Sequence, residues 1–265
     1  MLSSFVYQPP RLPPLTITPL SSIVNIEYDL VKETDVLSPA ARIMEIDCIR
    51  GIAIILMVIF HTVFDLAYFY NWPIDYLQGF WYYQGKAAAI LFMLISGIST
   101  TLSRSSMRRG LTVFGAGMLI TAATYYYNPT MYIQFGILHL LGFSMFIAPW
   151  TTRLPVLLLT STAIIFLLAG NVVADLTTAS PWLLPLGIKP VNFASLDYYP
   201  LLPYLGIIFF GIAIGKMLYS SKQSLWPSAL TNNFACGLRY LGRHSLLIYL
   251  IHQPILLAIL FLFLS

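Results

Sequence analysis

The chain has 265 residues, of which 58% are hydrophobic and only 9% charged, and its mean hydropathy is +0.79. These values exclude a soluble domain and predict an all-α integral membrane protein with several spans. The net charge of +4 is weak support for nucleic-acid binding, because a membrane topology by itself concentrates basic residues on one side.

The first 37 residues contain five prolines and no continuous apolar core beside a basic end, so they do not resemble a secretory signal peptide. We expect residues 1–37 to form a disordered cytosolic tail and residues 38–265 to form one transmembrane domain. Ser38 followed by Pro39 predicts a helix start, with the serine as N-cap and the proline in the first helical position.

Seven apolar segments approach the length of a membrane span, which is roughly 20 residues. With the N-terminus in the cytosol, their alternation puts twelve of the fourteen Lys and Arg residues on the cytosolic side, as the positive-inside rule requires. Cys48 and Cys236 then lie near the cytosol, where thiols stay reduced, so no disulfide is expected. The segments cover about 49–69, 84–103, 110–127, 132–150, 154–173, 201–219 and 243–264.

The first span carries four ionisable side chains in an apolar setting: Asp47, Arg50, His61 and Asp65. At about 100° per residue they fall within roughly 60° of one another and form one polar stripe. A charge inside a membrane helix costs at least about 2.5 kcal/mol and usually faces a protein interior or a wet cavity. The stripe therefore predicts a functional site, and the i,i+4 spacing lets the Asp65 carboxylate reach the His61 ring.

The outer loop at residues 71–83 is dense in aromatic side chains. Such rings are typical of membrane interfaces, and they also suit the lining of a sugar-sized acceptor cleft; the pattern leaves both interpretations open. Lys86 enters the second span at about the depth of Asp65. Its ammonium group either pairs with the Asp65 carboxylate across the hairpin or extends to the membrane surface.

Three arginines, Arg104, Arg108 and Arg109, follow the second span on the predicted cytosolic side. Such a cluster fixes topology or contacts anionic lipid, and it can also hold the phosphates of a cytosolic nucleotide-type cofactor. Arg243 at the start of the last span has the same two interpretations.

His139 lies about two turns into the fourth predicted span, close to the depth of His61, which favours a shared site. The outer connection 174–200 carries Asp197 and four prolines and is long enough to cover such a site. In the last span, Tyr249 and His252 share a face, and Pro254 removes a backbone donor, which favours a kink beside His252.

The chain resembles bacterial members of the heparan-alpha-glucosaminide N-acetyltransferase catalytic-domain family in four stretches: RIMEIDCIRGIAIILMVIFHTVFDL, LFMLISGIS, FGILHLLG and LGRHSLLIYLIHQPIL. The interval from Arg50 to His61 also resembles the signature of the wider acyltransferase type 3 group. The resemblance implies transfer of an acetyl group from cytosolic acetyl-CoA to a carbohydrate or amino-sugar acceptor on the other face of a bacterial plasma membrane.

His61 matches the essential histidine of the acyltransferase type 3 motif, whereas the lysosomal enzyme places its active histidine in the following loop, here Asn71 and Trp72. Independently of the family, a histidine near neutral pKa can act as base or nucleophile in acyl transfer, and a carboxylate such as Asp65 can orient it. We therefore expect His61 and Asp65 to be catalytic. The expected acceptor or cavity residues are Lys86, His139, Tyr249, His252 and Gln253, and the expected acetyl-CoA-binding residues are Arg50, Arg104, Arg108, Arg109, Arg239 and Arg243.

A proton-coupled small-molecule transporter is the alternative function, because intramembrane Asp, His and Lys groups also build proton relays. The seven unequal spans show no internal repeat of the kind that many carriers have. A purely structural or sensory protein would leave the polar stripe unexplained. A metal site is not expected, because the sequence has no short ligand pair such as His-x3-His, and the oligomeric state stays open.

Overall fold

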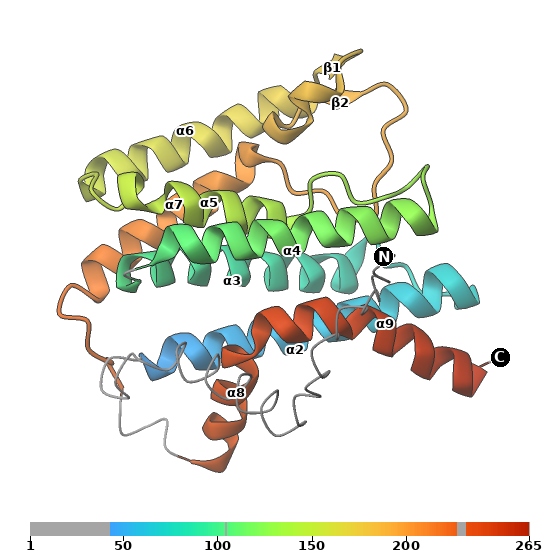
Figure 1. Cartoon of the computed structure of the whole chain (residues 1–265), viewed down its shortest axis with the longest axis horizontal. Helices are drawn as coiled ribbons and strands as arrows, with labels where there is room; N and C mark the ends of the chain where they lie inside the picture. Colours follow the sequence, from blue (N-terminus) through green and yellow to red (C-terminus); the bar gives the residue numbers. More distant parts are fainter. Residues whose placement is uncertain (1–42, 104, 227–231, 265) are drawn as a thin grey trace, which may run out of the picture. The chain divides into compact units, whose positions relative to one another are not determined.

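A computed structural model describes residues 43–103, 105–226 and 232–264, and these are mainly helical (Figure 1). The prediction of an all-α membrane protein is confirmed. Five of the described helices are long and apolar enough to cross a membrane: α2 (Met44–Tyr70), α3 (Gly79–Leu102), α6 (Val156–Ala174), α7 (Leu201–Leu218) and α9 (Ser245–Leu264). The predictions for the tail at residues 1–37 and for the Ser38 cap lie outside the described residues.

Two further predicted spans are also helices, α4 (Ser106–Tyr127) and the shorter apolar α5 (Ile137–Thr151). The structure adds α8 (Asn233–Arg243), an amphipathic helix before α9 in which Ala235, Leu238 and Gly242 are buried. The connection after α6 contains β1 (Thr177–Thr178), the 3₁₀ helix η2 (Pro181–Leu186) and β2 (Lys189–Pro190), with β1 and β2 paired in parallel.

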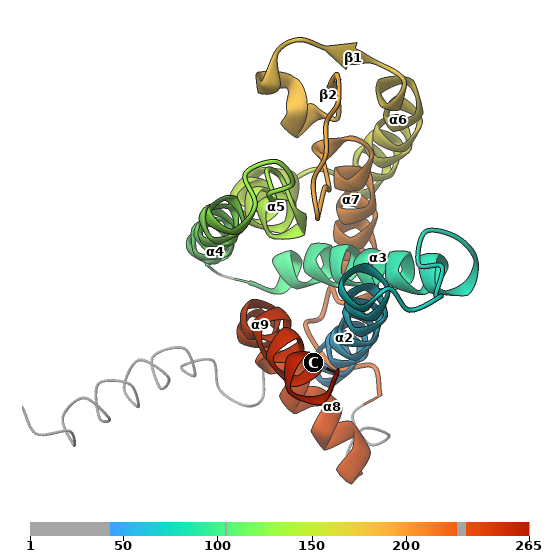
Figure 2. The ribbon, with the colours of Figure 1, turned by 90° about the vertical axis from the view of Figure 1, so that its right-hand side faces the viewer.

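The helices α2 to α7 alternate in direction (Figure 1). α4 packs on α5, α6 packs on α7, and α3 contacts α2, α5 and α7; Figure 2 shows α3 between these partners. The alternation collects the start of α2, the end of α3, the start of α4 and the end of α7 at one end of the bundle, which we call the basic end. We call the other end, where α2 finishes and α3 and α5 begin, the cavity end.

Glycines bring several helix pairs into close backbone contact. A Cβ at Gly97 of α3 would lie 2.2 Å from the Ile208 carbonyl oxygen of α7, and one at Gly211 would lie 2.3 Å from the Leu94 oxygen. Because lipid removes the hydrophobic driving force between helices, membrane helices associate through such small-residue contacts. The close contact between α3 and α7 agrees with the many small residues in the sequence of α3, including Ala87, Ala88, Ala89, Ser96, Gly97 and Ser99. α8 crosses α2 in the same way, with Gly242 directly against the Asp47 carbonyl.

The best-packed part of the described bundle lies between α3, α5, α6 and α7. Met93, Leu140, Leu159 and Ile208 are fully buried there. By contrast, half of the residues of α9 are exposed, and His252 is its buried residue. α9 touches mainly α2, so the polar side chains that these two helices share have a large part in positioning it.

Candidate functional site

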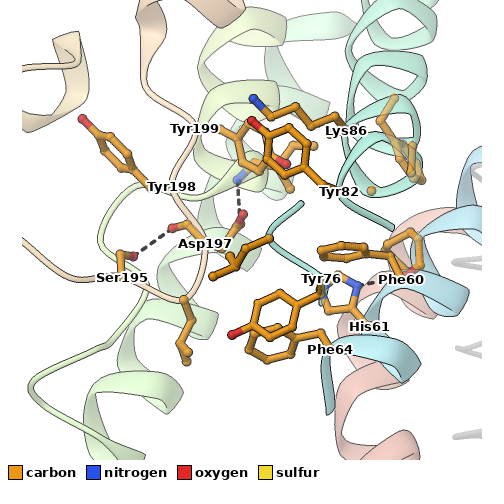
Figure 3. A pocket seen from close by; sticks show the side chains of 18 of the residues that line it. Phe60, His61, Phe64, Tyr76, Tyr82, Lys86, Ser195, Asp197, Tyr198 and Tyr199 are labelled. Atoms are coloured by element: carbon orange, nitrogen blue, oxygen red, sulfur yellow. Dashed lines mark hydrogen bonds between the residues drawn. The ribbon is translucent and has the colours of Figure 1, made fainter. Parts of the chain in front are cut away.

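A cavity of about 490 Å³ lies at the cavity end of the bundle. Its wall is formed by the second half of α2, the loop that follows it, the first half of α3, Met131 and the start of α5, the segment before α7, and single residues of α7 and α9. Tyrosines dominate the lining: Tyr68, Tyr76, Tyr82, Tyr198, Tyr199, Tyr204 and Tyr249. Apart from these phenols, the ionisable side chains of its described lining are His61, Lys86 and Asp197 (Figure 3).

His61 enters this wall from α2, and its Nδ1 lies 2.9 Å from the carbonyl oxygen of Met57 (Figure 3). A carbonyl can only accept, so Nδ1 carries the proton and Nε2 holds the lone pair. Within the described part of the chain, no residue makes a hydrogen bond to Nε2. The helix backbone thus sets the tautomer and leaves a basic nitrogen for a molecule in the cavity.

His252 of α9 lies directly behind His61. The two ring centroids are 4.7 Å apart and the rings meet edge to face at 80°. The Nδ1 atom of His252 is 2.6 Å from the Tyr249 carbonyl oxygen, whereas its buried Nε2 has no partner among the described residues. Tyr249 itself reaches the cavity wall, so α9 contributes one lining residue and one supporting imidazole.

Asp65 does not pair with His61 as its spacing predicted. The side chain is fully buried, its Oδ1 accepts a hydrogen bond from Nε2 of Gln253, and its Oδ2 has no described partner. The His61 ring is held back towards Met57, one turn earlier, while the Asp65 carboxylate points to α9. The expected His61–Asp65 hydrogen bond is therefore corrected to an α2–α9 link through Gln253.

Lys86 does not form the ion pair with Asp65 that was one of its two predicted arrangements. Its ammonium lies 4.8 Å from the centre of the Tyr82 ring one turn earlier on α3, a cation–π arrangement. Lys86 and Tyr82 both line the cavity, and Lys86 is exposed at its edge.

His139 lies near the cavity but is absent from its described lining, which corrects the expectation of a site shared with His61. The helix α5 begins at Ile137 and not at residue 132, so His139 falls in its first turn. Its Nδ1 accepts the N–H of Gly136 at 3.2 Å, and its Nε2 lies 3.3 Å from the Thr121 hydroxyl. Both ring nitrogens thus hold structure together, and the ring is 2% exposed.

The segment 195–199 runs beside residues 131–135 and brings Asp197 into the cavity. The N–H of Leu196 donates to Met131 at 3.2 Å, and the N–H of Tyr199 donates to Phe135 at 2.9 Å. The Asp197 Oδ2 accepts the N–H of Ile137 at 3.0 Å (Figure 3). This carboxylate replaces the missing N-cap of α5, because Gly136 in the N-cap position has no side chain.

Burial raises the pKa of Asp197 to about 6, although its hydrogen bond from the Ile137 N–H acts in the opposite direction. Burial also raises the pKa of Tyr198 to about 12 and that of Tyr199 well above the ordinary range for a phenol. These two phenols are therefore neutral at physiological pH. Asp197 is then the group in this segment that titrates near neutrality.

The family model for the catalytic domain of heparan-alpha-glucosaminide N-acetyltransferase matches residues 42–254. The chain belongs to this family. The match includes α2 to α8, the cavity and the first part of α9, so the arrangement described above is that of a membrane acetyltransferase family. No curated protein sequence and no solved structure matches the chain.

At the basic end of this acetyltransferase-family bundle, two of the arginines expected to bind acetyl-CoA are held by Asp47. Arg50 forms an ion pair with Asp47 at 3.0 Å and donates to Ser99 at 2.7 Å, and the Arg243 Nε lies 3.5 Å from the other carboxylate oxygen of Asp47. These contacts join α2, α3 and α8. They give Arg50 and Arg243 a structural task at the end opposite the cavity.

The remaining arginines of that set differ in their surroundings. Arg108 and Arg109 are exposed in the first turn of α4, where the helix N-terminus adds to their attraction for anions. Arg239 donates to the sulfur of Cys236 at 2.9 Å, and Arg104 lies outside the described residues. Among the described members of the set, Arg108 and Arg109 are thus the pair presented to solvent at the start of a helix.

The sequence did not assign Asp197 or most of the cavity tyrosines to the site. Their positions depend on residues 195–199 returning to residues 131–135, a contact across more than sixty positions of the chain. One clue was available, because Asp197, Tyr198 and Tyr199 stand together immediately before an apolar span. Polar residues directly before a span lie at one end of the helix bundle, which here is the cavity end.

Proposed function

We propose that the protein transfers an acetyl group from acetyl-CoA, bound at the basic end, to an amino-sugar or other carbohydrate acceptor in the cavity at the opposite end. The observation that supports this most directly is His61 in a chain of an N-acetyltransferase family: its Nε2 is a basic nitrogen in a tyrosine-lined cavity and has no hydrogen-bond partner among the described residues.

The cavity suits a carbohydrate in size and lining. A volume of about 490 Å³ falls within the usual range of small-molecule sites, roughly 300–1,000 Å³. Tyrosine rings offer flat apolar faces to the C–H groups of a sugar ring, and their hydroxyl groups can hydrogen-bond its hydroxyls. The aromatic loop at residues 71–83 contributes Tyr76, Leu77 and Tyr82 to this lining, which favours the acceptor-cleft interpretation for those residues.

His61 would act as the general base. An amino-sugar acceptor that arrives as an ammonium ion would first release one proton to water, because only the neutral amine has a lone pair. The His61 Nε2 would then take a proton from this amine, or from an acceptor hydroxyl, as that atom attacks the thioester carbonyl. A new N–C or O–C bond forms, the C–S bond breaks, and the imidazolium returns the proton to the departing CoA sulfur. His252, edge to face behind the ring, would restrict the orientation of His61, whereas Asp65 would act at a distance by holding α9.

The donor would approach from the basic end, with Arg108 and Arg109 meeting its phosphates. Along α2, Arg50 and His61 are eleven residues apart, which corresponds to about 16 Å of helix rise. A donor with its charged part at the basic end therefore needs an extended arm to bring the thioester to His61. In this proposal the N-terminus and the basic end face the cytosol, and residues 38–265 act as one domain.

The test is transfer of label from radiolabelled acetyl-CoA to a panel of sugars and amino sugars by the purified full chain in detergent. We expect label in at least one acceptor, and less label as salt concentration rises, since exposed arginine–phosphate attraction is screened. Absence of transfer with every acceptor, together with accumulation of an unmodified sugar in proteoliposomes, would contradict the proposal and favour the transporter.

The donor end can be tested separately. Replacing Arg108 and Arg109 together with Ala should raise the Kd of acetyl-CoA on the order of tenfold, because each exposed charge contributes roughly 1 kcal/mol or less. The matched control is Lys222→Ala, which removes an exposed cation after α7. An unchanged Kd in the double variant would return Arg108 and Arg109 to a role in topology.

A further inference from the structure

We propose that Asp197 is the acceptor-binding carboxylate of the cavity, where it holds the ammonium group of a cationic acceptor, and that the turn at residues 136–139 is built to fix this carboxylate in place. The inference rests on the proposed function, since it assigns the acceptor end of that site. It also makes Asp197 the residue that distinguishes an amino sugar from a neutral sugar.

The carboxylate and the backbone of Asp197 are each held by a hydrogen bond. The carboxylate Oδ2 accepts the Ile137 N–H at 3.0 Å. The hydroxyl of Ser195 lies 2.9 Å from the backbone carbonyl oxygen of Asp197 and 3.1 Å from that of Tyr132, and so links the two backbone segments. The second carboxylate oxygen, Oδ1, receives no hydrogen bond from the residues that the structure describes. The Oδ2 atom of Asp197 is therefore hydrogen-bonded to the backbone of α5, whereas Oδ1 can accept a hydrogen bond from a ligand.

The turn before α5 is shaped around this group. A Cβ on Gly136 would lie 2.3 Å from the Asp197 Oδ2, so only glycine lets the carboxylate approach the first N–H groups of α5. His139 takes the adjacent Gly136 N–H and thereby fixes the same turn. The stretch FGILH, which is part of the family resemblance, therefore holds the Asp197 carboxylate in place. His139 is a positioning residue, because it fixes the backbone turn that the carboxylate contacts.

Asp197 lacks a counter-ion in the described structure. No described Lys or Arg forms an ion pair with it, and the cation nearest in the site, Lys86, lies against Tyr82. Asp197 is half-buried, and a carboxylate partly removed from water without a cation is destabilised; a ligand that supplies the positive charge reduces this cost. The aromatic faces of neighbouring tyrosines would stabilise the same ammonium group through cation–π contact.

The acceptor preference should depend on pH. Burial raises the pKa of Asp197 to about 6, so its charge is lost as pH falls from about 7 to about 5, while an amine stays cationic. The other titratable groups around the cavity come from every element packed against it: His61 and Tyr68 on α2, Tyr76 on the following loop, Tyr82 and Lys86 on α3, His139 on α5, Tyr198 and Tyr199 on the segment of Asp197 itself, Tyr204 on α7 and Tyr249 on α9. The phenols and Lys86 do not change charge in this window, and glucose reports any effect of the two histidines that is independent of ligand charge.

The experiment measures binding of glucosamine and of glucose to the detergent-solubilised full chain by isothermal titration calorimetry at about pH 7. We expect glucosamine to bind more tightly, and Asp197→Asn to weaken its binding on the order of tenfold to a hundredfold, as expected for loss of a charged hydrogen bond. Glucose binding should change little. The asparagine keeps an oxygen for the Ile137 N–H, and Asp175→Asn, an exposed carboxylate after α6, is the matched control.

The same titration of the unmodified protein at about pH 5 covers the case in which Asp197→Asn misfolds. Glucosamine should there lose its advantage over glucose. Equal glucosamine affinity in the wild type and Asp197→Asn, or an advantage unchanged at low pH, would overturn the inference. If the wild type binds glucosamine through Asp197 but transfers no acetyl group, the proposed function fails while this binding role stands.

Discussion

Two helices beside the cavity, α2 and α5, each carry a histidine, of which only His61 lines the cavity, and the fold uses the two rings in opposite ways. On the α2 wall, a carbonyl oxygen faces Nδ1 of His61, so the lone pair lies on Nε2 and is available. At the start of α5, a backbone N–H faces Nδ1 of His139, so the proton lies on Nε2, which is within reach of Thr121. One ring retains a basic nitrogen for chemistry and the other has none.

The difference teaches that the partner of one ring nitrogen decides what the other can do. Both histidines are in apolar helices, and both were expected to share one site. The local backbone separates them, because a mid-helix residue meets a carbonyl oxygen one turn earlier, whereas a residue in the first helical turn meets free N–H groups. Beside the start of α5 the cavity therefore meets the carboxylate of Asp197, from the segment before α7, whereas α2 presents an imidazole.

The largest effect should come from removing the basic nitrogen of the α2 wall. His61→Ala should lower kcat by a factor of about 10² to 10⁴, the usual contribution of a general base, with little change in the melting temperature. Acetyl transfer and thermal unfolding in detergent measure the two quantities. Ile59→Ala, an exposed position on the same helix, is the control, and normal turnover in folded His61→Ala would contradict the assignment.

The matching change in α5 should affect stability before chemistry. His139→Ala leaves the Gly136 N–H without an acceptor, which should cost about 1–3 kcal/mol of unfolding free energy. It should also raise the KM of an amino sugar more than it lowers kcat. His139→Gln should recover both quantities, because glutamine in this third helical position can reach back to the N-cap N–H. If His139→Ala lowered kcat as much as His61→Ala, His139 would have a part in the chemistry and the proposed difference between the two histidines would be wrong.

A smaller effect is expected at Asp65, and it separates two roles. If Asp65 only ties α9 to α2, Asp65→Asn should keep transfer within a few-fold, since the amide oxygen still accepts from Gln253. Asp65→Ala should lower stability by about 1–3 kcal/mol, because it leaves the Gln253 amide unpaired. If Asp65 instead orients His61 during turnover, the Asn variant would show a far larger loss of kcat at unchanged stability.

The smallest effect concerns the stability of the ligand-free protein against pH. The folded-state pKa of Asp197, about 6, is above its ordinary value of 3.8, so the fold favours the protonated form. Its stabilising contribution is full below about pH 4 and is lost as pH rises through about 6. The melting temperature of the wild type should therefore fall by roughly 1–4 °C relative to Asp197→Asn between pH 4 and pH 7. Parallel profiles would show that the carboxyl does not titrate there.

Much of the helical framework could be predicted from the sequence, because membrane helices are coded locally. Each of the seven predicted segments coincides with a helix, and α2 ends one residue beyond the expected Phe69, where Asn71 adopts a left-handed conformation. The starts of α2, α3 and α5 each differ from prediction by five residues, and α5 is the segment that the structure shortens most. Its start was expected at residue 132, but the chain first runs beside residues 195–199, which apolar periodicity cannot reveal.

The site was predictable only on the α2 side. The spacing of Arg50, His61 and Asp65 places them on one face whatever surrounds the helix, so the polar stripe was visible in the sequence. Which neighbour each side chain takes was not visible, because rotamer choice depends on helices distant in sequence. Asp65 therefore points to Gln253 of α9, and Lys86 packs on Tyr82.

By itself, the sequence determined the membrane class, the helical segments and the presence of a polar stripe on α2, since hydropathy and helical period depend on neighbouring residues alone. The tertiary structure decided which groups share the cavity, because its walls come from α2, α3, α5, α7, α9 and the segment before α7. It placed Asp197 on one wall and set the tautomers of His61 and His139. Those outcomes depend on the hydrogen-bond partners that packing supplies, and no local pattern specifies them.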